Sequence, residues 1–271
     1  MTTRSTPSAS KQPNPTRLVL GLVATAAMLA GCGDSATSPA TSPATSPDTA
    51  VPPVIDLGSG ADYKPALDPA HVADVIDNPF MPLAIGSEWK YEGPSDEGIE
   101  TITVVVTSQR KTVMGISAYV VHDTVEVNGE VTEETYDWFT QDDKGNVWYL
   151  GEESTEYQGG VAVSTAGSWE AGVDGALPGI AMPAEPASGD AFRQEYYAGE
   201  AEDMFQIIAV DRTLTVPFGT YDRVITTKDW TPLRPANIEE KWYAYGVGVI
   251  YETHISGTGG PVELVSYTPG G

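Results

Sequence analysis

The chain has 271 residues and a mass of 28.7 kDa, which allows one large domain or two small ones. Fourteen basic and 38 acidic residues give a formal net charge of −24. A polyanion repels nucleic-acid phosphates and anionic lipid head groups, so the composition argues against charge-driven binding to either. The single cysteine excludes an internal disulfide, a four-cysteine zinc site and an iron–sulfur cluster.

The N-terminal segment has the features of a secretory signal peptide. Residues 1–31 carry three basic side chains and no acidic one, and an apolar run of 13 residues extends over positions 18–30. A basic start, a short apolar run and a small-residue cleavage region define such signals. The run is shorter than the roughly 20 residues that a membrane-spanning helix needs. We therefore expect residues 1–31 to be removed on export.

Cys32 predicts a lipid anchor. The sequence Leu29-Ala30-Gly31-Cys32 resembles the bacterial lipobox, in which the cysteine receives a diacylglyceryl group and becomes the first mature residue. An ordinary signal peptide followed by a chance cysteine is the alternative. Several acyl chains anchor a protein stably, at about 0.8 kcal/mol per buried methylene. Cys32 would thus attach the protein to a bacterial membrane, on the periplasmic side or at the cell surface. Loss of the leader leaves eleven basic against 38 acidic residues, a formal charge of −27.

Residues 32–53 are predicted to be a disordered linker. They repeat the unit Thr-Ser-Pro-Ala at positions 37–40 and 41–44 and continue with Thr-Ser-Pro-Asp. Without bulky apolar side chains such a stretch cannot bury a core. About 18 residues at roughly 3.1 Å each give a tether of up to about 55 Å. Residues 54–271 are then expected to form a single antiparallel β domain.

The domain is expected to be all-β. Asp68, followed by Pro69, predicts one short N-terminal helix over residues 68–76, and beyond it short β-branched and aromatic runs alternate with turn residues. About twelve strands are predicted, including residues 87–91, 100–109, 118–127, 130–138, 147–150, 192–197, 204–214, 221–230, 239–244, 247–254 and 262–267. A sheet of this size must curl, close or split. We expect a large curved sheet or a barrel or half-barrel, with a two-sheet sandwich as the competitor.

The clearest local signal is a hairpin centred on the Asn-Gly pair at 128–129. This pair accepts positive φ at both positions of a two-residue type I′ turn. The register of that turn pairs residues whose numbers sum to 257, so Tyr119 faces Trp138 and Asp123 faces Glu134. For the like-charge pair we expect side chains splayed into water, with a bridging cation as the alternative.

Two loops stand out between the strands. Residues 142–146 are acidic but lack the D-x-[DN]-x-[DN]-G spacing of a calcium loop, which predicts a plain turn with Gly145 in a left-handed position. Residues 165–189 are rich in Gly and Pro but also contain Trp169, Ile180 and Met182. We expect this long loop to pack on the sheet, either completing the core or covering a ligand.

Several motifs carry a family resemblance. The segments 78–83 (Asn-Pro-Phe-Met-Pro-Leu) and 86–91 (Gly-Ser-Glu-Trp-Lys-Tyr) resemble the opening of a group of uncharacterised bacterial lipoproteins. Later segments that are similar to the same group are 143–149, 167–172, 216–221 and 243–249. The last two also look like periplasmic lipoprotein-carrier half-barrels, and this more distant likeness implies a lipid-sized cavity. The resemblance spans residues 78–263 and assigns no functional residue.

The sequence contains no recognisable active-site pattern. It has no G-x-S-x-G elbow, no H-E-x-x-H motif, no phosphate-binding loop and no dinucleotide fingerprint. His122, Asp123 and Glu134 could supply metal ligands but lack ligand spacing, and spacing alone does not identify a carboxylate pair for glycoside hydrolysis. We therefore assign no catalytic, cofactor-binding or metal-binding residue.

These observations favour an extracytoplasmic protein that is attached to a membrane through Cys32 and is not an enzyme. Its domain would bind an apolar or amphiphilic ligand inside the curved sheet, under the loop 165–189, without a cofactor or nucleic acid. One alternative is a cell-envelope interaction or structural module whose partner meets an acidic surface. A hydrolase that uses a carboxylate pair is the other.

Overall fold

The computed structural model describes residues 57–257 and 259–271. The predicted signal peptide, Cys32 and the linker lie outside these residues. The described residues form fifteen strands and one 3-10 helix, η1 (Gly60–Asp62). They contain no helix that is long and apolar enough to span a membrane.

The strands belong to one antiparallel sheet. Their bounds are β1 (Glu88–Ser95), β2 (Gly98–Val113), β3 (Ile116–Val127), β4 (Glu130–Gln141), β5 (Val147–Gln158), β6 (Val161–Ser164), β7 (Trp169–Glu170), β8 (Leu177–Met182), β9 (Ala191–Arg193), β10 (Glu195–Tyr196), β11 (Met204–Val216), β12 (Gly219–Trp230), β13 (Ile238–Ala244), β14 (Gly248–Ser256) and β15 (Val262–Thr268).

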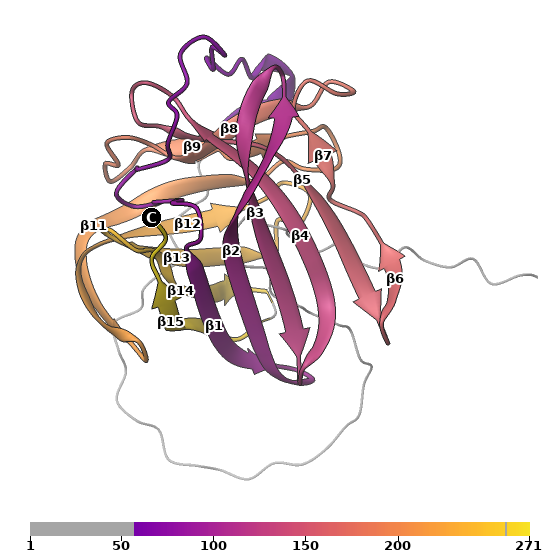
Figure 1. Cartoon of the computed structure of the whole chain (residues 1–271), viewed down its shortest axis with the longest axis vertical. Coiled ribbons are helices and arrows are strands. Elements are labelled where there is room, and N and C mark those ends of the chain that lie inside the picture. Colours follow the sequence, from indigo (N-terminus) through magenta and orange to yellow (C-terminus); the bar gives the residue numbers. More distant parts are fainter. Residues whose placement is uncertain (1–56, 258) are drawn as a thin grey trace, which may run out of the picture.

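The sheet path runs β10-β8-β5-β4-β3-β2-β1-β15-β14-β13-β12-β11-β9, with β6 and β7 added against β5. Its two ends come from one segment of chain, because β9 and β10 are separated only by Gln194. The ladder stays open between them. The predicted all-β class and large curved antiparallel sheet are confirmed. Figure 1 shows β2–β5 in front of the orange and yellow strands of the second half, with the indigo N-terminal segment beside β8 and β9.

The two halves of the sheet pack on each other through their inward faces. The large apolar side chains that are fully buried come from both halves, and they include Trp89, Tyr91, Phe139, Phe205 and Ile225. Direct bonds tie the halves together, since the hydroxyl of Tyr91 on β1 donates to the carbonyl of Val249 on β14 over 3.0 Å. Side chains of alternate residues on each strand therefore share one interior.

The hairpin β3–β4 forms at the predicted turn but in a different register. Asn128 and Gly129 both have positive φ, 53° and 82°, as the type I′ turn requires. A bulge between Val125 and Glu126 then shifts the pairing by one residue, so Asp123 lies opposite Thr135 and not Glu134. The predicted like-charge pair was wrong because the bulge inserts an extra residue on one strand only. Asp123 itself points inward, because it shares one face of β3 with the buried Val121 and Val125.

The short helix predicted over residues 68–76 does not form. Asp68 does cap a turn, accepting from the backbone N–H of Ala70 through its carboxylate (2.9 Å) and of His71 through its carbonyl (2.9 Å). A helix would need the backbone N–H groups that follow as donors to its own carbonyls. The N–H of Ala73 bonds instead to the carbonyl of Gln141 at the end of β4, over 2.8 Å. The capping signal was thus local, whereas the pairing partner lies about 70 residues further along the chain.

The two loops of the sequence analysis are structural. In the turn after β4, the Asp142 carboxylate accepts from Asn146 and from the indole of Trp148, at 2.8 and 3.0 Å, and Gly145 has φ 94°. Through these bonds the carboxylate of Asp142 holds the turn together. Residues 165–189 form β7 and β8 against β5 and bury Trp169 and Met182. This loop completes the core, and its Ile180 also lines a cavity.

Candidate functional site

Two adjoining cavities lie where the first described residues cross the open end of the sheet. One has a volume of about 420 Å³ and lies between residues 57–66, β8 and β9. The other has about 550 Å³ and extends toward the loop after β12. Ligand pockets are typically about 300–1,000 Å³. Residues 57–59 and Arg193 line both cavities, so the two spaces meet at this arginine.

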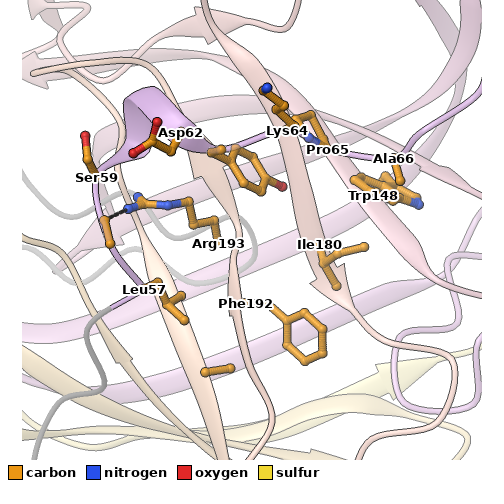
Figure 2. A pocket seen from close by; sticks show the side chains of 13 residues that line it. Leu57, Ser59, Asp62, Lys64, Pro65, Ala66, Trp148, Ile180, Phe192 and Arg193 are labelled. Carbon is orange, nitrogen blue, oxygen red and sulfur yellow. Dashed lines mark hydrogen bonds between the residues drawn. The ribbon is translucent and has the colours of Figure 1, made fainter.

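The walls of the cavities are mainly apolar and aromatic. In the smaller cavity they are formed by Leu57, Tyr63, Pro65, Trp148, Ile180 and Phe192 (Figure 2). In the larger one they are formed by Tyr196, Met204, Trp230, Pro232 and Pro235. Such walls suit the hydrocarbon part of a ligand.

Residues 57–63 are held over the sheet end by close packing. A Cβ on Gly60 would lie 1.7 Å from the ring of Tyr196, so only glycine allows this approach. The hydroxyl of Tyr63 donates to the carbonyl of Pro178 on β8 over 3.0 Å, and its ring meets that of Tyr196 edge-on at 6.4 Å. The N-terminal segment is therefore a fitted wall of both cavities.

Arg193 is the polar centre of the site. Its side chain is 6% exposed, and its Nη2 donates to the carbonyl of Gly58 over 2.7 Å. Its Nη1 has no hydrogen-bond partner among the described residues. The guanidinium lies 5.6 Å from the ring centre of Tyr196. Burial raises the pKa of Tyr63 to about 12, and the positive charge of Arg193 opposes that shift.

A second polar feature lies deeper, between the two halves of the sheet. Nine carboxylates, none more than 4% exposed, form a connected group that we call the carboxylate network. Its members are Asp123, Glu133, Asp137, Glu152, Glu195, Asp203, Asp229, Glu239 and Glu252. Burial of this many ionised groups is prohibitively unfavourable unless protons or cations neutralise them.

Protonation is the main way in which these buried carboxyls are neutralised. The hydroxyl of Tyr149 lies 2.5 Å from Asp137 Oδ1 and 2.6 Å from Glu152 Oε2, between the two carboxyls. Burial, partly offset by the bond from Tyr149, raises the pKa of Asp137 to about 7. Burial and the neighbouring charges of Asp137 and Glu133 raise the pKa of Asp123 well above its usual value. Asp123 Oδ1 makes no hydrogen bond within the described part of the chain.

Lys241 supplies a positive charge to the network. Its Nζ lies 3.3 Å from Glu252 Oε2, and both side chains are 1% exposed. Burial still dominates at the carboxyl and raises the pKa of Glu252 to about 7. Among the described residues no group of three His, Cys, Asp or Glu side chains has the arrangement of a metal site. The network is thus a proton-bearing interior whose carboxyls present almost no surface to a substrate.

The metal ligands considered in the sequence are not brought together. His122 stacks on Tyr136 at 4.4 Å between ring centres, and its Nε2 lies 3.5 Å from Glu134 Oε1 on the outer face. Asp123, one residue along the strand, faces the interior. Strand alternation therefore separates His122 from Asp123 and places Asp123 on the face of the buried Val121 and Val125.

The motifs that carry the family resemblance meet one another in the fold. The indole N–H of Trp89 donates to the carbonyl of Val247 over 2.8 Å, and the N–H of Gly246 bonds to the carbonyl of Pro79 over 2.6 Å. Asn78 Nδ2 donates to two carbonyls, including that of Gly145 at 2.9 Å. These residues fasten the first motif to the last and to the turn after β4, so their role here is structural.

Sequence reasoning missed Arg193 and placed the site too deep. The ligand was expected inside the curved sheet, whereas the cavities lie at its open end. Arg193 belongs to no motif, and its contact with Gly58 joins positions 135 residues apart. The only signal in the sequence is a basic residue in a predicted strand of a chain with few basic residues.

The comparisons with known proteins are sparse. No protein-family model and no curated protein matches the chain. A solved structure of a protein described as exported, with a YmcC-like fold, from Bacteroides fragilis has 13% identity, covering 68% of this chain and 96% of that chain with a TM-score of 0.40. A protein described as a lipoprotein, from Parabacteroides distasonis, has 12% identity, covering 72% and 100%, with a TM-score of 0.34. Likeness of this extent assigns neither a role nor a site to this chain.

Proposed function

We propose that this chain is an exported, lipid-anchored binding protein that holds an apolar or amphiphilic ligand in the cavities around Arg193. The observation that carries the proposal is the pair of adjoining spaces, about 420 and 550 Å³, with aromatic and aliphatic walls. Their walls include Leu57 and Gly58, the first described residues after the predicted linker. A ligand bound there would lie where the tether from Cys32 joins the domain.

Binding without chemistry is the simpler use of this site. The cavities present one buried cation and mainly apolar walls. Most carboxylates with raised pKa values belong to the network, where none is more than 4% exposed. A general acid or base must reach its substrate within hydrogen-bond distance. This burial supports a non-enzymatic role.

Native mass spectrometry tests the proposal directly. The sample is the chain from residue 32 onward with Cys32→Ser, which removes the acyl chains, purified after secretion and measured again after incubation with a lipid extract of the host. We expect an added mass that disappears on denaturation. A bare polypeptide mass in both samples would refute ligand binding and favour the interaction module.

Two variants locate the bound mass. Ile180→Trp places a larger ring in the smaller cavity and is expected to abolish the adduct. Val161→Trp adds the same ring on the exposed strand β6, where Val161 is 64% exposed, and is expected to leave the adduct in place. Equal adducts in the two variants would show that the ligand binds elsewhere.

A further inference from the structure

We propose that the ligand carries an oxyanion, a carboxylate or a phosphate, and that Arg193 binds this group while the cavity walls hold an attached hydrocarbon chain. The inference rests on the proposed function and adds the charge and the orientation of the ligand. It follows from the state of Arg193, from its position between the cavities and from the groups around it.

The guanidinium of Arg193 is buried, but its charge and its N–H donors are only partly paired with other groups. An arginine side chain stays protonated in proteins and offers five N–H donors. Here one terminal nitrogen bonds to the carbonyl of Gly58, whereas the other has no partner in the described part of the chain. No described carboxylate lies within ion-pair distance of it. A buried charge without a counter-charge is unfavourable, so an anion arriving at Nη1 would be bound more strongly than in water.

The position of Arg193 selects an amphiphile over a free anion. The side chain lines both cavities, and the rings of Tyr63 and Tyr196 lie next to it. Apolar surroundings strengthen the attraction between opposite charges. Because the walls beyond the guanidinium are apolar, the remainder of the ligand gains by being hydrocarbon, at about 25 cal/mol per Å² removed from water.

The net negative charge of the rest of the protein bears on which group can recognise an oxyanion. With 38 acidic residues against 14 basic ones, the electrostatic field of the protein repels anions at long range. A buried cation that lines a pocket is an exception to this overall negative charge. Lys64 is exposed at the rim of the smaller cavity and adds a second positive charge, whereas Asp62 and Glu202 at the two rims are negative. Specific recognition of an oxyanion must therefore come from Arg193 itself, through a directed pair of N–H bonds.

The test compares ligands that differ only in the head group. Dodecanoate, dodecyl phosphate and dodecanol are titrated at pH 7.5, below their micelle concentrations, into the chain from residue 32 onward carrying Cys32→Ser. Binding is followed by the fluorescence of Trp148 and Trp230, which line the two cavities. We expect the two anions to bind about 10- to 100-fold more tightly than dodecanol, the range of a hydrogen-bonded charge pair.

Three variants connect this preference to Arg193. Arg193→Met is expected to remove the preference for the anions, so that dodecanoate and dodecanol bind with similar affinity, and to fold, because replacing a buried ionic group by an apolar one of similar volume is tolerated. Arg193→Gln, which keeps donors but not the charge, covers the case in which Arg193→Met fails to fold. Arg110→Met is the matched control, since Arg110 also stacks on a tyrosine, 3.4 Å from the ring centre of Tyr119, but lines neither cavity.

The outcomes separate this inference from the proposed function. Equal binding of dodecanol and dodecanoate, or equal weakening of both by the Arg193 variants, overturns the oxyanion assignment and leaves the binding function standing. Absence of binding by all three amphiphiles overturns both. Acetate and inorganic phosphate form the last arm, because binding of these chainless anions as tight as that of the amphiphiles would keep Arg193 as an anion site and overturn the hydrocarbon-binding function.

Discussion

Raising the pH from 5 to 8 is expected to destabilise this protein, because the carboxylate network holds protons that the unfolded chain releases. Burial raises the pKa of Asp137 from 3.8 to about 7 and that of Glu252 from 4.5 to about 7. A carboxyl with a raised pKa in the folded state stabilises the fold fully below its unfolded pKa. It loses that contribution as the pH rises through the folded pKa.

The size of the effect follows from proton linkage. Each proton that the folded state retains and the unfolded state has lost lowers the free energy of unfolding by about 1.4 kcal/mol per pH unit. One carboxyl that titrates near 4 when unfolded and near 7 when folded thus loses about 2.6 kcal/mol between pH 5 and 8. Two such groups reach about 5 kcal/mol, comparable with the whole stability of many domains. Because these carboxyls interact, we expect a total loss of at least about 3 kcal/mol.

Asp123→Asn isolates one member of the network. Asparagine has the shape of the protonated acid and carries no charge at any pH. We expect the variant to be more stable than the parent by an amount that grows from pH 5 to pH 8, with the slope reduced by up to about 1.4 kcal/mol per pH unit. Asp222→Asn is the matched control, since Asp222 is exposed on β12, and its slope should equal that of the parent protein.

Urea unfolding monitored by tryptophan fluorescence at pH 5, 6, 7 and 8 measures these slopes, because all six tryptophans lie in the described domain. Stability that stays constant or rises from pH 5 to 8 would refute the protonated network. An Asp123→Asn slope equal to that of the parent would show that Asp123 takes no part in it.

Three further predictions concern the anchor and the cavity. Cys32→Ala in the full chain should abolish the incorporation of labelled palmitate and release the protein from the membrane fraction; retention of the label would refute lipidation at Cys32. Gly60→Ala should destabilise the domain by about 1–3 kcal/mol through overpacking against Tyr196 and should weaken dodecanoate binding. Gly219→Ala, whose new Cβ would have no neighbour closer than 3.8 Å, should do neither, and equal melting temperatures of the two variants would contradict the close fit. Raising the ionic strength from 0.01 to 0.15 M shortens the screening length from about 30 to 8 Å, so dodecanoate should associate faster while dodecanol is unaffected; slower association of dodecanoate in salt would contradict repulsion by the acidic surface.

The strands could be predicted because their signals are local. Alternation of apolar residues and turns such as Asn128-Gly129 depend on neighbours in sequence, and most expected strands appear near their expected bounds. The strand expected over 147–150 continues to Gln158, and the one expected over 192–197 is divided into β9 and β10. The helix at residues 68–76 failed because the N–H of Ala73 pairs with Gln141 at the end of β4. Local capping chemistry carries no information about such a distant partner.

The interior could not be predicted because it depends on what the second half of the sheet covers. A charged residue in an alternating strand is normally read as facing water, and Asp123 was read in that way. Asp123 lies on the same face of β3 as the buried Val121 and Val125, and Lys241 on β13 and Glu252 on β14 come close enough to influence its pKa. Among 38 acidic residues, the sequence does not mark the nine that the fold encloses.

The carboxylate network also explains why a binding site would lie at the end of the sheet and not at its centre. The interior between the halves is occupied by protonated carboxyls and their hydrogen bonds, which gives a hydrocarbon chain no apolar space there. Apolar walls of sufficient size occur where β8, β9 and residues 57–66 meet. Because Gly58 holds Arg193 and Gly60 packs on Tyr196, the segment that continues from the linker forms part of the wall that a bound ligand would contact. Occupancy of the cavity and the path of the tether would therefore be coupled through the same few residues.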